Sequence, residues 1–379
     1  MDFSLTESQK ILKAMVRDFA DKELEPIAAQ IDEEARFPAE QYTRMGQLGL
    51  TGVPFPEKYG GGGGGKIEEI IIDEEISRVS AAVGTILFVS SGLAGWPIYT
   101  YSTEEQRQRF IVPIAAGTEL ASFALTEPGA GSDAAAIQTT ARRERGGYVL
   151  NGTKVFISNG AEAGIIVVFA TLDRALKHKG ITGFIVERGM PGFQVAKVEN
   201  KLGVRASSTA ELVFTDCFVP DKNRLDGEGE GFRIAVNAID SSRVSVAAQG
   251  LGISRAAFEH ALAYAKERRQ FDQPIADFQA IQWMLADMAT QMDATRLLTY
   301  RAAYLQEHGQ PFIKEASMAK LFAAESTMFV TTKALQIFGG YGYLKSFPLE
   351  RYFRDARILE IYEGTSEMQR RTIARQLMR

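Results

Sequence analysis

The chain has 379 residues, of which 45% are hydrophobic and 24% are charged, as expected of a globular protein long enough for two or three domains. Its net charge of −4 offers no basic surface for nucleic acid or for an anionic membrane. One cysteine, Cys217, excludes an internal disulfide and fits a reducing compartment, and the three histidines are too scattered to predict a metal site.

The N-terminus reads as a helix. Thr6 and Gln9 form a T-x-x-Q capping box, and apolar residues between Ile11 and Phe19 fall on one helical face. The segment lacks the basic start and apolar stretch of a signal peptide, and no apolar run in the chain looks long enough for a membrane span. We therefore expect no signal or transit peptide, and a protein of the bacterial cytoplasm or a mature matrix-type protein.

Helical periodicity continues through residues 1–116, which we predict to be an all-α domain. A second capping box, at Thr103 and Gln106, predicts another helix start. Trp96 and Pro97 allow two readings, since they fit either core packing or the wall of a substrate pocket.

The run Gly60–Gly65, followed by Lys66, satisfies the G-x-x-x-x-G-K spacing of a phosphate-binding loop. Ile67 occupies the position where such a loop needs Ser or Thr for Mg²⁺, and Glu68 would repel a phosphate at the same helix start. Six glycines in a row also carry a large ordering entropy, so we interpret the run as a loose surface turn.

From residue 117 to 226 the pattern changes to short β-branched and aromatic runs separated by Gly, Asn-Gly and Pro, which predicts a small β domain, a barrel or a sandwich. Cys217 lies in the apolar run "LVFTDCFVP" and is predicted to be a buried core residue. Residues 227–379 return to long helical patterns that predict an up-and-down four-helix bundle. The expected fold class is α+β, with helical, β and helical domains in that order.

A second glycine cluster, "FALTEPGAGSD", contains Gly129-x-Gly131-x-x-Ala134, a formal Rossmann fingerprint. Further strands follow it where a Rossmann loop requires a helix, so this fold is not expected. The segment still offers backbone N–H groups and the hydroxyls of Thr126 and Ser132, which can hold a polar ring edge or a phosphate.

Near the C-terminus, Glu363 follows an apolar approach and precedes Gly364, which frees the backbone to turn. A carboxylate delivered in this way can be desolvated and act as a general base. The alternative is a solvated surface acid in the loop before a helix that Thr365 caps, and the spacing by itself favours this second reading.

Five motifs, "ALTEPGAGSD", "NGTKVFISNG", "ERRQF", "QIFGGYGY" and "RDARILEIYEGTSE", together resemble the acyl-CoA dehydrogenase family in order and spacing, nearly from end to end. The resemblance implies FAD bound between the β domain and the C-terminal helices, in a homotetramer built as a dimer of dimers. It also implies an acyl-CoA substrate, an electron-transferring flavoprotein as electron acceptor, and a place in fatty acid β-oxidation. The motifs look closest to short-chain, butyryl-type members.

Carried over by position, the resemblance implies a large set of FAD contacts, with the later ones made to the FAD of a neighbouring subunit or to its adenine half. These residues are Phe123, Ala124, Leu125, Thr126, Glu127, Pro128, Gly129, Ala130, Gly131, Ser132, Phe156, Ile157, Ser158, Arg268, Gln279, Gln336, Ile337, Phe338, Gly339, Gly340, Thr365, Ser366 and Glu367. The family more often has Trp-Ile-Thr where this chain has Phe156, Ile157 and Ser158. Implied substrate contacts are Ser132, Asp240, Ser241, Ser242, Arg243 and Gly364.

The resemblance assigns Glu363 as the base. It would remove the α-proton of a saturated acyl-CoA while a hydride leaves the β-carbon for flavin N5, giving the trans-2-enoyl-CoA. Some branched- and long-chain members carry the base on a bundle helix, at the position of Ser242, and a serine cannot serve there. For Arg243, contact with CoA and a buried salt bridge within the bundle both remain open.

Two other functions remain open. An acyl-CoA oxidase or a flavin monooxygenase would use the same scaffold. A non-catalytic assembly or binding module would keep the fold, although loss of the base or of the FAD contacts would then be expected.

Overall fold

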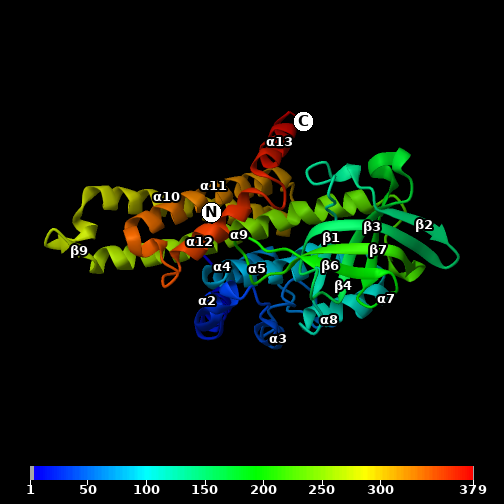
Figure 1. The fold of residues 1–379 in the computed structure, drawn as a ribbon, viewed down its shortest axis with the longest axis horizontal. Coiled ribbons are helices and arrows are strands. Elements are labelled where there is room, and N and C mark those ends of the chain that lie inside the picture. The colour runs from blue at the N-terminus through cyan, green and yellow to red at the C-terminus, as the bar shows by residue number, and fades with distance from the viewer. Residues whose placement is uncertain (1–3, 379) are drawn as a thin grey trace.

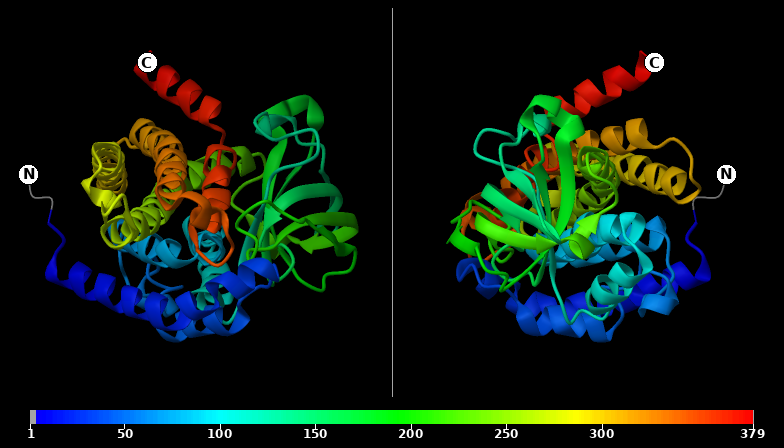
Figure 2. Two further views of the ribbon diagram at one scale, coloured as in Figure 1. Left: turned by 60° about the vertical axis from the view of Figure 1, so that its left-hand side comes forward. Right: turned by 90° about the vertical axis from the view of Figure 1, so that its right-hand side faces the viewer.

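The structure, a computed structural model, describes residues 4–378. Helices occupy the first and last thirds of the chain and a sheet occupies the middle, so the predicted α+β class with a central β domain is confirmed (Figure 1). The sheet domain stands beside the C-terminal helices, and the N-terminal helices run beneath both (Figure 2).

Some neighbouring helices of the N-terminal domain are joined through π-helical segments, and others are separated by loops. The helices of this domain are α1 (Glu7–Phe19), α2 (Glu25–Glu33), α3 (Ala39–Gln47), α4 (Lys66–Val79), α5 (Ala81–Phe88), α6 (Trp96–Tyr101), α7 (Glu104–Gln106) and α8 (Val112–Ala115). Both predicted capping boxes are present, because the Thr6 and Thr103 hydroxyls accept from the backbone N–H of Gln9 and Gln106. Local sequence thus sets these two helix starts.

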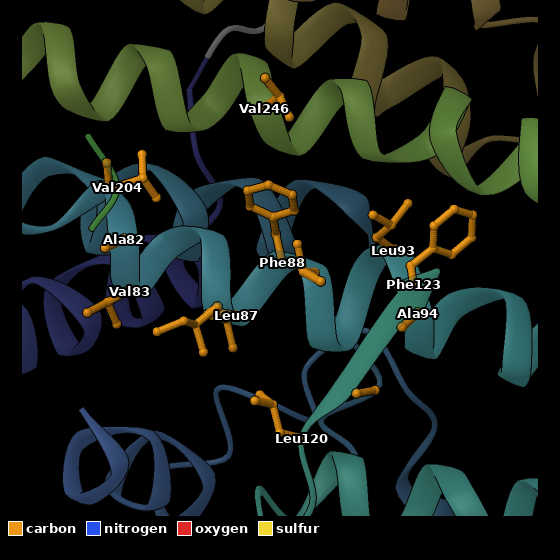
Figure 3. Packing of buried hydrophobic residues seen from close by; sticks show 14 of the residues in the cluster. Ala82, Val83, Leu87, Phe88, Leu93, Ala94, Leu120, Phe123, Val204 and Val246 are labelled. Atoms are coloured by element: carbon orange, nitrogen blue, oxygen red, sulfur yellow. The ribbon is translucent and has the colours of Figure 1, made fainter. Parts of the chain in front are cut away.

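From Ala81 to Tyr101 the chain is one continuous helical run of 21 residues, long and apolar enough to cross a membrane. The expectation that no run reaches this length is wrong. The run is almost entirely buried inside the protein, as expected for the central helix of a large core. Figure 3 shows it between α9 and β1, with Phe88 pointing toward the helix that carries Val246. Trp96 packs edge-on against Tyr101 and Pro97 is buried.

The glycine run is fixed, so its interpretation as a loose turn is wrong. The N–H groups of Gly62, Gly63 and Gly64 donate to backbone carbonyls of residues 52–55. A Cβ on Gly61 would lie 2.0 Å from the carbonyl oxygen of Phe55, so glycine is needed there for close packing. The side chain of Lys66 is buried, and its Nζ donates to Glu69 and Ser245 within the protein.

The middle domain is a single eight-stranded sheet with the order β6-β7-β3-β2-β4-β5-β8, and β1 pairs with β4. Its strands are β1 (Ala121–Ala124), β2 (Thr140–Glu144), β3 (Gly147–Ser158), β4 (Ile165–Thr171), β5 (Ile181–Glu187), β6 (Phe193–Val198), β7 (Thr209–Pro220) and β8 (Arg224–Leu225). Cys217 lies in β7 opposite Leu150 and is buried, as predicted, and burial raises the pKa of its thiol to about 11.

The C-terminal helices carry the longest elements of the chain. They are α9 (Gly231–Glu267), α10 (Gln279–Glu307), α11 (Ile313–Phe338), α12 (Leu349–Ala356) and α13 (Ser366–Leu377). A short hairpin of β9 (Arg269–Gln270) and β10 (Gln273–Pro274) joins α9 to α10. The helices α9, α10 and α11 pack together, and α4 of the N-terminal domain lies against α9 and α10. The predicted fourth helix, α13, instead packs on α11 and projects from the body (Figure 1).

Candidate functional site

The segment around Thr126 and the end of β3 are distant in the sequence, but they form one surface at the end of the sheet. The backbone N–H of Val155 donates to the carbonyl oxygen of Thr126 at 2.9 Å, and Ser122 Oγ donates to that of Ser158 at 2.7 Å. The register between β3 and β7 shifts near Phe156, which adopts a φ of +59° and is 67% exposed. A bulge therefore turns a large aromatic ring outward beside the Thr126 segment.

The open part of this surface lies at Gly129 and Gly131. A Cβ built on either glycine meets no atom of residues 4–378 within 4 Å. Ser132 is also exposed, whereas Phe123, Ala124, Leu125 and Ala130 are buried beneath. The segment offers backbone and hydroxyl groups next to an exposed ring, with space above them. Such a surface fits a flat aromatic group with a polar edge.

A buried ion pair supports this segment from below. Lys154 Nζ, which is fully buried, donates to Glu127 Oε1 at 2.7 Å and to the carbonyl oxygen of Leu125 at 3.0 Å. The carboxylate of Glu127 also accepts from the backbone N–H groups of Gln138 and Thr139. Burial lowers the pKa of Lys154 to about 8, and Glu127 acts against that shift. The pair ties the strand that carries Phe156 to the glycine-rich segment.

The second group of predicted residues meets between α9 and the segment before α13. Glu363 adopts a φ of +50°, unusual for a residue with a Cβ, and Gly364 follows at +88°. Ser242 on α9 donates from Oγ to Glu363 Oε2 at 2.7 Å. The carboxyl group therefore points back into the protein, against the N-terminal half of α9. The surface-acid reading is wrong for this side chain.

Two buried side chains hold the strained turn. Lys320 Nζ on α11 donates to the carbonyl oxygen of Gly364 at 2.6 Å. Gln369 Nε2 donates to the carbonyl oxygens of Glu363 at 3.0 Å and Gly364 at 2.8 Å. A backbone conformation that costs about 1–3 kcal/mol persists only when its surroundings fix it, and these bonds supply that constraint.

The electrostatics of this corner suit a base. Burial raises the pKa of Glu363 above its usual value, while the Ser242 hydrogen bond and the charges of Lys320 and Arg243 act in the opposite direction. Burial also lowers the pKa of Lys320 to about 8, against the pull of Glu363. A carboxyl group with a raised pKa, held at a fixed position, has the properties of a general base near neutral pH.

Arg243 pairs with Asp240 one turn away on α9 and also donates to Ser317 Oγ at 3.2 Å. Both members of this ion pair are buried. The salt bridge within the bundle, one of the two readings of Arg243, is therefore present, and a contact with CoA stays a prediction. Ser241 accepts from Gln306 Nε2 at 2.7 Å.

Other predicted residues lie at the far end of the helices. Arg268 ends α9, with its guanidinium 5.6 Å from the ring centre of Tyr341, just beyond Gly339 and Gly340. Gln336 is exposed and lines a surface groove of about 520 Å³, and Ile337 and Phe338 are buried. Arg243 and Arg268 are 25 positions apart on α9, about 37 Å along the helix, so one chain does not bring the two ends together. Gln279, exposed at the start of α10, also lies toward the far end.

The segment after the base forms the start of α13. Thr365 Oγ1 accepts from the N–H of Met368 and caps the helix, as the sequence predicted. Ser366 Oγ is buried without a hydrogen-bond partner among the described residues, and Glu367 is exposed. This helix start therefore has donor capacity that the protein itself does not use.

Sequence reasoning missed Lys154, Lys320 and Gln369. Lys154 and Lys320 each interrupt a stretch of apolar or small residues, and a lysine in such a stretch is a usable signal for a buried pair. Gln369 lies among polar and charged residues and gives no such signal. Their partners, however, are 27, 44 and five or six residues away in sequence, and no local pattern connects them.

Comparison with known proteins decides the family. Models of the three acyl-CoA dehydrogenase domains match residues 6–118 (N-terminal domain), 122–217 (middle domain) and 229–378 (C-terminal domain). The chain belongs to the acyl-CoA dehydrogenase family. The short-chain specific acyl-CoA dehydrogenase of Clostridium acetobutylicum is 50% identical over 379 residues, the whole of both chains.

Solved structures agree with this membership. Butyryl-CoA dehydrogenase from Megasphaera elsdenii matches with a TM-score of 0.98 and 44% identity, covering both chains completely. A chain in a structure described as the electron transferring flavoprotein of Acidaminococcus fermentans matches with a TM-score of 0.99 and 48% identity, again over both full chains. The protein is thus an acyl-CoA dehydrogenase, and the cofactor of this family is FAD.

The residues present fit FAD. The exposed ring of Phe156 and the open space above Gly129 and Gly131 match a flat ring system with a polar edge. At the far end, Gly339 and Gly340 leave open space around exposed backbone, as close approach to a phosphate requires.

Proposed function

We propose that this dehydrogenase converts a short saturated acyl-CoA to its trans-2-enoyl-CoA, with Glu363 as the base that removes the α-proton. The observation that carries the proposal is the Glu363 carboxyl itself, turned inward at a positive φ and bonded to Ser242. A solvated acid would need no such support, whereas a base requires a fixed position and a raised pKa.

The backbone at the same residue supplies a second function. Within residues 4–378 the N–H of Glu363 has no hydrogen-bond partner, although both carbonyl oxygens of the turn are held by Lys320 and Gln369. A fixed and free donor beside the base suits the thioester oxygen, on which negative charge develops as the α-proton leaves. The strain at Glu363 thus places an acid–base group and a donor together.

The remaining residues bind and orient. Thr126, Ser132 and Ser158 are proposed to hold the ring edge of FAD, with Phe156 against its face. When bound, FAD accepts the hydride from the β-carbon. Arg268, Gln279 and the Gln336–Gly340 segment are proposed to reach the FAD of a neighbouring subunit in a homotetramer. An electron-transferring flavoprotein as acceptor is supported by the similarity to the Acidaminococcus structure. A cytoplasmic location is part of the same proposal.

The deciding experiment replaces Glu363 by Gln, which keeps the shape and removes the base. We expect Glu363→Gln to bind FAD and butyryl-CoA and to lose anaerobic flavin reduction by three or more orders of magnitude, because activated nucleophiles and bases contribute on this scale. The measurement is stopped-flow flavin absorbance after mixing with butyryl-CoA. Near-normal reduction in the variant would refute the assignment of the base.

The oxidase alternative is separated from the dehydrogenase in the same apparatus. Once the wild-type flavin is reduced by butyryl-CoA, admission of air should reoxidise it slowly and an electron-transferring flavoprotein should do so rapidly. Rapid peroxide formation in air would instead identify an oxidase. A colourless protein that cannot be reconstituted with FAD would identify a non-catalytic module.

A further inference from the structure

The hydroxyl of Ser242 lies between two acceptors. Its Oγ is 2.7 Å from Glu363 Oε2 and 3.0 Å from the carbonyl oxygen of Ile239, one turn back on α9. A serine hydroxyl has one hydrogen and two lone pairs, so it donates to one acceptor at a time and can accept as well. The geometry therefore describes a hydroxyl that can turn between a carboxylate and a backbone carbonyl.

The charged side chains near Glu363 form hydrogen bonds to other groups and not to its carboxyl oxygens. Lys320 Nζ donates to the carbonyl oxygen of Gly364, and Arg243 pairs with Asp240. Among the described residues, Ser242 supplies the hydrogen bond that reaches the Glu363 carboxyl oxygens. Lys320 and Arg243 act on Glu363 through their charge, at longer range.

We propose that Ser242 is a positioning residue that serves the base in both of its protonation states. While Glu363 is ionised, the Ser242 hydroxyl donates to it. After Glu363 takes the α-proton, the acid donates to Ser242 Oγ, and the serine turns its own hydrogen to Ile239. The proton stays on Glu363 and Ser242 only reorients. The inference rests on the proposed function, because it needs Glu363 to be the base.

The expected signature is a shift in pH dependence. A hydrogen bond to an ionised carboxylate is stronger than one from the neutral acid, so the bonded serine favours the ionised base. Removing the hydroxyl should therefore raise the pKa of Glu363. The acid limb of anaerobic flavin reduction should move to higher pH by about one unit. A purely structural defect would lower the rate at every pH.

Other charged groups around the base are unchanged in this comparison. They are Arg243 and Asp240 on α9, Lys320 on α11, and Tyr362, Glu360 and Glu367 from the segment that carries Glu363. Wild type and variants share these groups. Their titration therefore contributes to every pH profile that is compared. The difference between profiles then reports the Ser242 hydroxyl.

The test uses the FAD-loaded protein with Ser242→Ala and Ser242→Cys, the second having nearly the same shape and a weaker donor. Ser254→Ala is the matched control, since Ser254 is also a buried serine on α9 but bonds to Thr327. We expect the midpoint pH of the acid limb to increase from wild type to Ser242→Cys to Ser242→Ala. The pH profile of Ser254→Ala should coincide with that of wild type. If the alanine variant does not fold, the cysteine variant alone decides.

A second readout needs no turnover. Infrared titration of the substrate-free protein, with the band of the protonated carboxyl assigned by its loss in Glu363→Gln, should show the same order of midpoints. Superimposable acid limbs and midpoints, or a uniform loss of rate without a shift, would overturn the inference. Failure of the proposed function looks different, because Glu363→Gln would then keep flavin reduction.

Discussion

Two glycine-rich segments look alike in the sequence and differ in their surroundings. In Gly60–Gly65 the backbone packs against residues 52–55, and a Cβ on Gly61 would overlap Phe55. Around Gly129 and Gly131 a Cβ would meet no atom of the described chain within 4 Å. Glycine permits close packing of the protein on itself in the first segment, and it leaves room for a ligand in the second. The P-loop spacing in the first segment and the Rossmann spacing in the second do not predict these roles.

The largest effect on stability is expected from breaking the Lys154–Glu127 ion pair beneath the Gly129 segment. Lys154→Met leaves the Glu127 carboxylate buried without its partner, which costs about 3–5 kcal/mol of unfolding free energy. The measurement is urea unfolding of the apoprotein. The double variant Lys154→Met/Glu127→Gln removes both charges and should recover at least half of the loss. A loss below about 1 kcal/mol in the single variant would show that the pair is not needed.

The next effect concerns the first segment. Gly61→Ala places a Cβ 2.0 Å from a backbone oxygen, so the loop must shift, and we expect a loss of about 3 kcal/mol in the same unfolding measurement. Gly60→Ala is the matched control, since Gly60 has a φ of +79° but nothing within 4 Å, and it should lose only about 1 kcal/mol. Equal losses would mean that packing does not distinguish these glycines.

The smallest effect on stability is expected at Gly129. Gly129→Ala meets no atom, so the apoprotein should unfold within about 0.5 kcal/mol of wild type. Its FAD dissociation constant should nevertheless rise severalfold, because the methyl group occupies the space left for the ligand. Fluorescence titration with FAD measures this. Unchanged affinity in a stable variant would contradict the role of the open surface.

The sequence predicted those parts of the molecule that depend on neighbouring residues. Helix starts at Thr6 and Thr103, the change from helical to strand periodicity and the burial of Cys217 follow from local patterns, and the structure confirms them. The family resemblance pointed to Glu363. Local spacing alone favoured a solvated acid, because nothing near Glu363 in the sequence shows that Ser242 meets it from 121 residues away.

Contacts between distant segments explain the remaining errors. The glycine run was interpreted from the flexibility of isolated glycine, whereas its conformation is set by residues 52–55 folding back on it. The sequence predicts no apolar run long enough for a membrane span, whereas the structure joins residues 81–101 into one continuous helix. Lys154 lies in the motif "NGTKVFISNG", but its partner, like that of Lys320, is fixed only by strand pairing and helix packing.

The buried thiol of Cys217 makes the native protein a poor target for alkylating reagents. With a pKa of about 11, about one thiol in ten thousand is ionised at neutral pH, and the sheet shields even that fraction. Modification then requires a local opening that exposes the buried face of β7 around Cys217. The rate at which Cys217 is alkylated therefore reports how often the β domain opens, and no engineered probe is needed.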